Sequence, residues 1–232
     1  MHETVEKQYI PCLKIDQKYG RSEFGIMSNF VWQTDPKRLL FVLSRYKFVS
    51  KMLFGCRNAL EIGCADAFGT RIVRQAVPEV LATDIDPIFI EDNLIREKKS
   101  AWPISFKVHD ILSAPLPAFE GVFSCDVFEH IPPELEERFI ENVRDSMTDN
   151  GIAIIGCPSL ESQIYASLGS KLGHVNCKSG EELQSLWKKY FHNVLLFSMN
   201  DEIVHTGLSK MAHYLFIVCT SKRSHELCSS MH

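Results

Sequence analysis

The sequence predicts an α/β protein built on a mostly parallel seven-stranded sheet, with helices on both faces and a C-terminal antiparallel strand pair. Three observations lead to this fold class. Short apolar runs alternate with amphipathic segments from residue 58 onward, a glycine-containing loop follows the first run, and a short polar segment joins the last two runs. Alternating strand and helix patterns are typical of parallel sheets with right-handed crossovers.

The individual elements follow from the same patterns. The expected strands are 58–62, 79–83, 104–108, 121–126, 151–157, 193–199 and 212–219, and the expected helices lie near 68–76, 87–98, 133–147 and 180–190. The last two strands are close enough in sequence to pair antiparallel.

The sequence before the first strand divides into two parts. Its beginning shows little periodicity and predicts an irregular arm or lid. Asp35-Pro36 marks the start of an amphipathic capping helix over 35–54, because Asp is a good N-cap and Pro is favoured in the first helical turn. The expected divisions are thus an arm over 1–34, a main domain over 35–220 and a flexible tail over 221–232.

Composition narrows the function classes. With 232 residues, 45% of them apolar and 23% charged, the chain is typical of one globular domain with a sizeable core. A net charge of −4 makes a nucleic-acid partner unexpected, since nucleic-acid binders usually carry a basic surplus. We expect no membrane span and a cytoplasmic location, because no apolar run approaches ~20 residues, the N-terminus is polar, and the eight scattered cysteines form no CxxC pair.

The loop after the first strand favours an adenosine ligand. Glu61 ends the strand, Gly63 permits a sharp turn, and Gly69 lets the next helix pack closely. A pyrophosphate-binding loop needs G-x-G-x-x-G, because a Cβ at the second glycine would block the pyrophosphate. In this sequence Ala65 stands at the position of that second glycine. The loop therefore suits a nucleoside cofactor without a pyrophosphate, such as S-adenosylmethionine.

Two further carboxylates follow the next strands. Asp84 ends the second strand and is placed to accept hydrogen bonds from ribose hydroxyls. Asp110 follows the third strand, where a carboxylate can meet an adenine amine, and Glu61 can answer the cationic amino group of a methionine moiety. Asp84 alone is equally consistent with a cap for the helix that starts at Asp86-Pro87.

The runs ALEIGCADAFGT, VLATDIDP, FKVHDI and FSCDVFEHIPP together resemble the motif series of class I S-adenosylmethionine-dependent methyltransferases. The resemblance covers about residues 55–160 and is greatest to the branch of ubiquinone-biosynthesis O-methyltransferases. It implies a Rossmann-like methyltransferase domain with S-adenosylmethionine as cofactor. The expected cofactor-binding residues are Glu61, Gly63, Cys64, Ala65, Gly69, Asp84, Ile85, Asp110, Ile111 and Asp126.

The segment after the fourth strand carries candidate chemistry. Asp126, Glu129 and His130 are spaced to share one side of a helical turn, and His174 follows the fifth strand. The set resembles the metal site of small-RNA 3′-end 2′-O-methyltransferases, which implies Mg²⁺ held by Glu129, His130 and His174. In the metal-free alternative the His packs under the cofactor and the Glu caps a helix, and His130 or His174 is the catalytic base.

Two other segments allow two interpretations each. Asn200, Asp201 and His205 lie between the last two strands and are either substrate contacts or turn residues that satisfy their own backbone. The 35–54 helix, which carries Arg45, is either a lid over the crevice or an edge helix with a solvated basic face.

The combined prediction is a methyltransferase that uses S-adenosylmethionine, with O-methylation of a small-molecule or glycan acceptor. The alternatives are a catalytically silent module that binds the cofactor and an NAD-dependent dehydrogenase, against which Ala65 counts. The sequence carries no signal for the oligomeric state.

Overall fold

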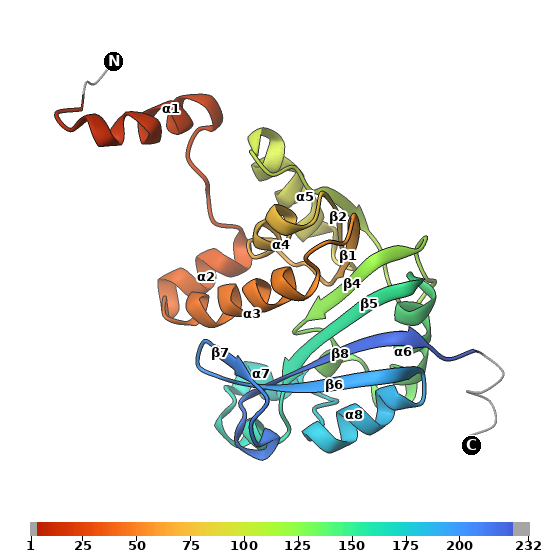
Figure 1. The fold of residues 1–232 in the computed structure, drawn as a ribbon. Coiled ribbons are helices and arrows are strands. Elements are labelled where there is room, and N and C mark those ends of the chain that lie inside the picture. Colours follow the sequence, from red (N-terminus) through yellow and green to blue (C-terminus); the bar gives the residue numbers. More distant parts are fainter. Residues whose placement is uncertain (1–3, 225–232) are drawn as a thin grey trace.

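A computed structural model describes residues 4–224, and the fold is an α/β arrangement around one twisted sheet (Figure 1). The sheet has eight strands in the order β3-β2-β1-β4-β5-β8-β6-β7. The strands are β1 (Asn58–Ile62), β2 (Glu79–Asp84), β3 (Ser105–Val108), β4 (Phe119–Cys125), β5 (Met147–Pro158), β6 (Phe191–Asn200), β7 (Ile203–His205) and β8 (Tyr214–Lys222).

The pairing confirms the predicted sheet with one addition. Strands β1 to β5 pair in parallel, whereas β8 pairs antiparallel with both β5 and β6. The eighth strand is β7, a three-residue strand that pairs antiparallel with the end of β6. It escaped prediction because three residues are too few to show a strand period.

Helices cover both faces of the sheet. They are α1 (Ile10–Tyr19), α2 (Ile26–Thr34), α3 (Arg38–Met52), α4 (Thr70–Ala76), α5 (Pro87–Arg96), α6 (Glu136–Asp145), α7 (Leu168–Gly173) and α8 (Gly180–Lys188). Figure 1 shows α3 and α4 on one face and α6 and α8 on the other. None of the helices within residues 4–224 combines the length and apolar character that crossing a bilayer requires.

The core is divided between these two faces by the alternation of side chains along each strand. Leu60 and Val122 pack with the cluster that contains Trp187 of α8. Their neighbours Ala59 and Phe123 pack on the opposite side with residues of α3 and α4. Both sides of the central strands are buried, as expected for a parallel sheet covered by helices.

The N-terminal arm differs from its prediction. Its described part is helical rather than irregular, with α1 and α2 joined by a short linker. Helix α1 buries no residue and projects from the body of the molecule (Figure 1), so no apolar stripe marks it in the sequence. Helix α2 lies against α3. The predicted tail over 221–232 lies mostly outside the described residues.

The burial of Leu60 gives a stability prediction. Leu60 is 0% exposed at the centre of the sheet, so Leu60→Ala removes core packing and is expected to cost about 2–5 kcal/mol of unfolding free energy. Leu195→Ala on β6 is the control, because Leu195 is 57% exposed and its loss is expected to cost less than about 0.5 kcal/mol. Urea denaturation measures both, and equal losses would contradict the assigned core.

Candidate active site

The candidate site is a cavity at the carboxyl ends of β1 and β4. The strand order reverses between these two strands, which is where open α/β sheets bind ligands. The cavity has a volume of about 440 Å³. Its lining residues come from α2, α3, the β1–α4 loop, the end of β4 and α7, and include Met27, Val31, Leu39, Arg45, Gly63, Ala65, Asp66, Gly69, Asp126, Glu129, His130, Ser170 and His174.

The loop between β1 and α4 has an unusual backbone. Gly63, Ala65 and Ala67 have φ values of 74°, 43° and 51°, all in the left-handed region. The two alanines each bear a conformational cost of roughly 1 kcal/mol, because their Cβ atoms crowd the following carbonyl. At Gly63 a Cβ would also overlap the side chain of Val127. Such strain persists only where the surrounding structure fixes it.

Hydrogen bonds from β2 and α5 fix this loop. The Ala65 amide donates to Oδ2 of Asp84 at 2.8 Å, and the Asn93 side chain donates to the Ala65 carbonyl at 2.8 Å. Arg96 donates to the Asp66 carbonyl at 2.6 Å. The other oxygen of Asp84 accepts from the Asp86 amide at 2.9 Å, so Asp84 holds both the loop and the turn after β2.

Glu61 is a buried carboxylate held by two hydroxyl groups. Tyr46 of α3 donates to Oε1 at 2.7 Å, and Thr70 of α4 donates to Oε2 at 2.5 Å. Burial raises the pKa of Glu61 to about 7, although both hydrogen bonds act to lower it. Gly69 is required here because a Cβ would overlap the Tyr46 ring. This glycine therefore allows the close approach of α3, in addition to the expected packing of α4 on the sheet.

Asp126 is held by a cation from α3. Its backbone is left-handed, with φ of 59°, and Nη1 of Arg45 lies 2.6 Å from its Oδ2. The Arg45 guanidinium stacks over the Tyr214 ring at 3.8 Å. Burial acts to lower the pKa of Arg45, but Asp126 together with Tyr214 and Cys125 raises this pKa above its usual range. The Arg45 side chain is only 13% exposed, so the solvated-face interpretation is wrong for this residue.

Glu129 is a buried carboxylate whose charge lacks a compensating partner in the described part of the chain. It is 1% exposed, and within residues 4–224 neither of its carboxylate oxygens has a hydrogen-bond partner. Burial raises the pKa of Glu129 well above its usual range, and the nearby charge of Asp126 adds to this rise. The Nε2 atom of His130 lies 3.9 Å from its Oε1.

Two histidines complete this end of the cavity, and their rings lie 5.3 Å apart. The Nδ1 atom of His130 is 2.8 Å from the Gly173 carbonyl, so Nδ1 carries the proton in the neutral ring. The Nδ1 atom of His174 is 2.8 Å from Oε1 of Gln163. The Gln163 amide donates to the Ser159 carbonyl, which assigns its Oε1 as an acceptor. Both Nε2 atoms are thus left unprotonated and free to accept a proton or bind a cation.

The ligand atoms of Glu129, His130 and His174 suit a divalent transition-metal cation. One ligand atom each from Glu129, His130 and His174 lie within 4.8 Å of one another. Histidines that bind metals usually donate their other ring N–H to a carbonyl, as both do here. Two imidazoles and one carboxylate suit Mn²⁺, Fe²⁺, Co²⁺ or Zn²⁺ better than Mg²⁺, which prefers oxygen ligands.

Comparisons with known proteins give a match in the segment that carries most of the site. Residues 60–153 match a family described as "Methyltransferase domain". The matched segment contains the strained loop, Asp84 and the Asp126–His130 segment. This part of the chain is therefore similar to a methyltransferase domain.

Solved methyltransferase structures share the fold at low identity. N-methyltransferase NodS from Bradyrhizobium japonicum WM9, in complex with S-adenosyl-L-homocysteine, is 15% identical with a TM-score of 0.62 over 90% of this chain and 97% of its own. A methyltransferase from Thermotoga maritima, described as a possible histamine N-methyltransferase, is 16% identical with a TM-score of 0.64 over 85% and 98% of the two chains.

A further structure with this fold is the methyltransferase domain of bacterial-CtHen1-C. It is 13% identical, with a TM-score of 0.63 over 78% of this chain and 98% of its own. Comparison with curated protein sequences gives no significant match.

Of the ten predicted cofactor residues, five line the cavity and five, Glu61 and Asp84 among them, do not. Gly63, Cys64, Ala65, Gly69 and Asp126 line the cavity. Along the neighbouring strand ends, Ile85 is 66% exposed and Asp110 accepts a hydrogen bond from the Leu112 amide at 2.8 Å. The Ile111 side chain packs in the core and offers a ligand no side-chain contact.

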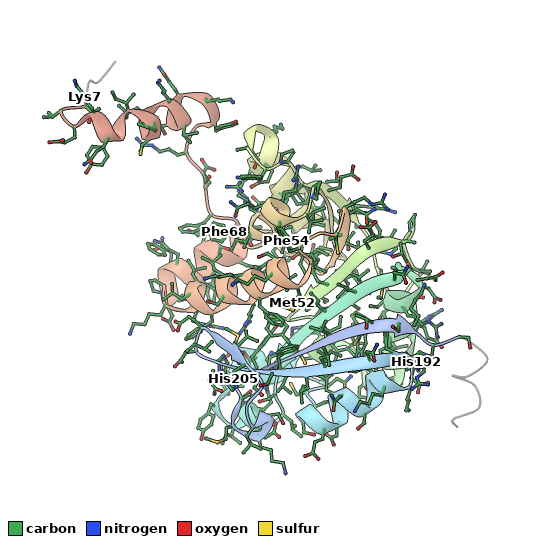
Figure 2. All side chains as sticks on the ribbon, in the orientation of Figure 1. Lys7, Met52, Phe54, Phe68, His192 and His205 are labelled. Atoms are coloured by element: carbon green, nitrogen blue, oxygen red, sulfur yellow. The ribbon has the colours of Figure 1, made fainter. Side chains whose placement is uncertain are left out.

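The predicted substrate residues lie elsewhere. Asn200, Asp201 and His205 form the β6–β7 hairpin (His205 is labelled in Figure 2), and none of the three lines the cavity. Nε2 of His205 is 3.0 Å from the Asn200 side chain, which also donates to the Met211 carbonyl. Asp201 has a left-handed φ of 49° at the turn. These contacts favour the interpretation as turn residues.

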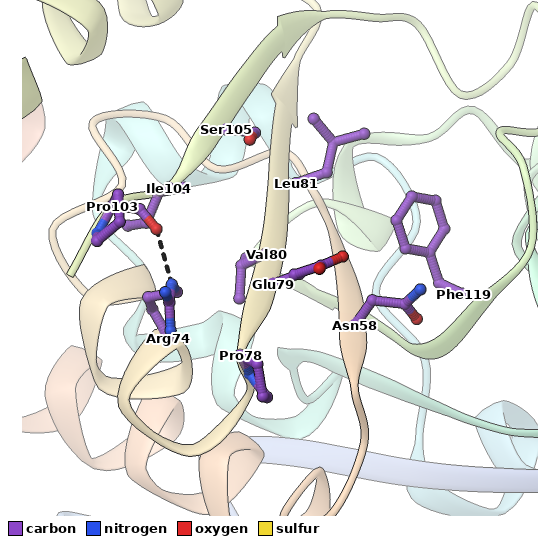
Figure 3. A pocket seen from close by; sticks show the side chains of 10 residues that line it. All are labelled: Asn58, Arg74, Pro78, Glu79, Val80, Leu81, Pro103, Ile104, Ser105 and Phe119. Atoms are coloured by element: carbon purple, nitrogen blue, oxygen red, sulfur yellow. Dashed lines mark hydrogen bonds between the residues drawn. The ribbon is translucent and has the colours of Figure 1, made fainter.

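A second cavity lies at the opposite end of the strands (Figure 3). It has a volume of about 360 Å³ and is lined by the first residues of β1, β2, β3 and β4. Its arginine, Arg74, donates to the Pro103 carbonyl at 2.7 Å. None of the predicted site residues lines it, so we assign the chemistry to the cavity at the carboxyl ends.

The raised pKa of Glu61 gives stability a pH dependence of defined sign. An acid whose folded-state pKa of about 7 exceeds its ordinary value of 4.5 holds its proton more tightly when folded, so stability falls as the pH rises between these values. Relative to Glu61→Gln, the wild type is expected to lose up to roughly 3 kcal/mol between about pH 5 and pH 8. Urea denaturation of both proteins across this range tests this, and a constant difference would contradict it.

Proposed function

We propose that the chain transfers the methyl group of S-adenosylmethionine to a small acceptor held beside Glu129, His130 and His174. The observation that carries this proposal is one shared cavity. The cofactor loop and the Glu129–His174 cluster line the same space of about 440 Å³, which favours a small molecule or one end of a glycan. Methyl transfer requires the acceptor atom to lie in line with the sulfonium carbon, so orientation is the main task of such a site.

The cofactor end of the site has a role for each carboxylate. Asp84 accepts one backbone hydrogen bond on each oxygen and keeps further lone pairs for the ribose hydroxyls. Asp110 is proposed to meet the adenine amine. Glu61 has both oxygens engaged by Tyr46 and Thr70, and we propose that it stabilises the methionine amino group through its charge.

We propose a hydroxyl oxygen as the methylated atom. The resemblance to ubiquinone-biosynthesis O-methyltransferases supports an oxygen acceptor. His130 and His174 both leave Nε2 free, and burial together with the charge of His130 lowers the pKa of His174. His174 is therefore neutral near pH 7 and able to take the proton that the hydroxyl releases.

We further propose that Glu129, His130 and His174 hold a divalent cation of the borderline class. A bound cation would lower the pKa of an acceptor hydroxyl. The unpartnered carboxylate of Glu129 supports this, because a buried carboxylate without a partner is costly unless a cation completes its site. Gly173 and Gln163 orient the two imidazoles in either case.

A primary amine is the second candidate acceptor. With Glu129 ionised, the cluster offers only hydrogen-bond acceptors: one carboxylate and two unprotonated ring nitrogens. A primary ammonium carries three N–H donors and matches these three acceptors as well as a cation does. A histidine would then remove its proton before transfer. The two candidates differ in one respect, which is whether the cluster binds a metal.

Cofactor binding is tested first by Asp84→Ala. The variant loses the ribose acceptor and the bond that holds Ala65, so its Kd for S-adenosylhomocysteine is expected to rise about 100-fold or more by titration calorimetry. Asp149→Ala is the control, since the Asp149 side chain is 97% exposed and pairs with Lys222. Preferential binding of NAD would contradict the proposal, and binding without methylation of any compound in a metabolite extract would favour a silent module.

Metal binding is tested by thermal unfolding with Mn²⁺, Zn²⁺ or Mg²⁺. A cation at 100 times its Kd is expected to add about 2.7 kcal/mol of stability. At one fixed concentration, Mn²⁺ or Zn²⁺ is expected to raise the unfolding temperature more than Mg²⁺, because this donor set binds them more tightly. Glu129→Gln and His174→Ala are expected to lose this shift. His205→Ala is the control, because His205 lies on the hairpin outside the cavity. No shift with any metal would overturn the cation site and favour the amine.

A further inference from the structure

The first turn of α2 is capped by a residue of the cofactor loop. The N-cap of α2 is Gly25, which has no side chain to offer. The Ser28 amide instead donates to Oδ2 of Asp66 at 2.6 Å, and the Ser28 hydroxyl is 3.2 Å from its Oδ1. An uncapped helix leaves its first amides without partners, so α2 depends on Asp66 for the end of the helix that faces the site.

The contact between arm and loop is close. A Cβ on Gly25 would overlap the Asp66 side chain, so only glycine admits this approach. The Phe24 ring packs on Phe68 of the loop, with ring centroids 5.1 Å apart (Phe68 is labelled in Figure 2). Met27 and Ser28 of α2 line the cavity itself. Helix α2 is therefore a wall of the site, seated directly on the loop that binds the cofactor.

The cap forms only when the loop has its observed shape. Asp66 lies between Ala65 and Ala67, both in the left-handed conformation, and its carboxylate is turned toward α2 while Arg96 binds its carbonyl. Asp66 is 5% exposed, so its charge depends on the hydrogen bonds from Ser28 and on a longer one from the Phe68 amide at 3.3 Å. A change in the backbone of the loop would withdraw the carboxylate from α2.

The linker before α2 allows the helix to move. Gly20 ends α1 with φ of 74°, and nothing lies near the position of its missing Cβ. Between Gly20 and Gly25 the chain is held to the body by Ser22, whose hydroxyl accepts from Arg71 at 3.2 Å. The contacts before Phe24 are few and polar, so α2 is held in place by the Asp66 cap, the Phe24 packing and its contact with α3.

We propose that Ser28 and Asp66 are positioning residues that couple the closure of α2 over the cavity to the binding of S-adenosylmethionine. The inference rests on the proposed function, because it requires the loop to bind this cofactor. A bound cofactor selects the loop conformation that presents Asp66, and the capped helix in turn stabilises that conformation. Weakening the cap lowers the fraction of protein whose loop is ready to bind the cofactor. The apparent Kd for the cofactor rises by the same factor.

The test is hydrogen exchange of residues 24–34 with and without S-adenosylhomocysteine, together with its Kd from calorimetry. In the wild type the ligand is expected to slow exchange of this segment about tenfold or more. Ser28→Ala removes the hydroxyl bond and keeps the amide bond, whereas Asp66→Ala removes both. They are expected to raise the Kd about threefold and tenfold, respectively, and to reduce the ligand-induced slowing. The double variant is expected to bind no more weakly than Asp66→Ala, since that change already removes both bonds of the cap.

Thr34→Gly is the matched control. Thr34 is an exposed residue of the same helix whose hydroxyl bonds only the Phe30 carbonyl at 2.8 Å, so the low helix propensity of Gly weakens α2 without touching the loop. The variant is expected to speed exchange in both states and to keep both the Kd and the ligand-induced slowing. Equal effects of Thr34→Gly and Ser28→Ala would show that the cap only stabilises the helix and does not couple it to the cofactor. Ligand binding with unchanged exchange of α2 overturns the coupling alone, whereas no ligand binding overturns the proposed function.

Discussion

The whole site depends on one strained loop that hydrogen bonds hold in place. Ala65 and Ala67 occupy left-handed conformations that cost energy, and Asp84, Asn93 and Arg96 bind the backbone between them. These three residues come from β2 and α5, so the shape of the loop is set by elements that follow it in the chain. The loop in turn gives Asp126 and the arm their neighbours. A cofactor that fits this shape adds stability to a conformation that the chain otherwise holds against its local preference.

The fold was largely predictable from sequence, and so was the position of the candidate cofactor residues at one edge of the sheet, because both depend on local patterns. The strands alternate with helices, and the candidate residues lie at or just after the ends of strands that must meet at one edge, namely Glu61, Gly63, Asp84 and Asp110. The unpredicted contacts join segments far apart in the chain: Arg45 with Asp126, Tyr46 with Glu61, and Ser28 with Asp66. Arg45 and Tyr46 lie in a helix whose periodicity shows that it packs, but not what it packs against. The polar residues of the β6–β7 hairpin were predicted to be substrate contacts because polar side chains suit ligand binding. In the structure, these residues instead make contacts within their own turn.

The acceptor end is defined by an imbalance of charge. Asp126 is compensated by Arg45, yet Glu129 lies deeper and has no partner within the described residues. Burying such a carboxylate does not stabilise the fold, because no partner compensates for its lost solvation. The pKa of Glu129 is raised for the same reason. Around it, Gly173 and Gln163 fix both imidazoles so that each presents an unprotonated nitrogen. Acceptors arranged without donors imply that a ligand brings the positive charge, and this constraint is stronger than any single residue match.

Residues outside the segment 60–153 complete the candidate site. The segment 60–153 supplies the loop, Asp84, Asp126, Glu129 and His130. The walls of the cavity come from α2 and α3 before it and from α7 after it, and Tyr214 of β8 supports Arg45 from beneath. Because Arg45 fixes Asp126 and α2 rests on Asp66, these outer segments also control the geometry of the inner ones. A shared fold does not by itself fix the ligands of a site, so the residues of these outer segments carry the information that the fold leaves open.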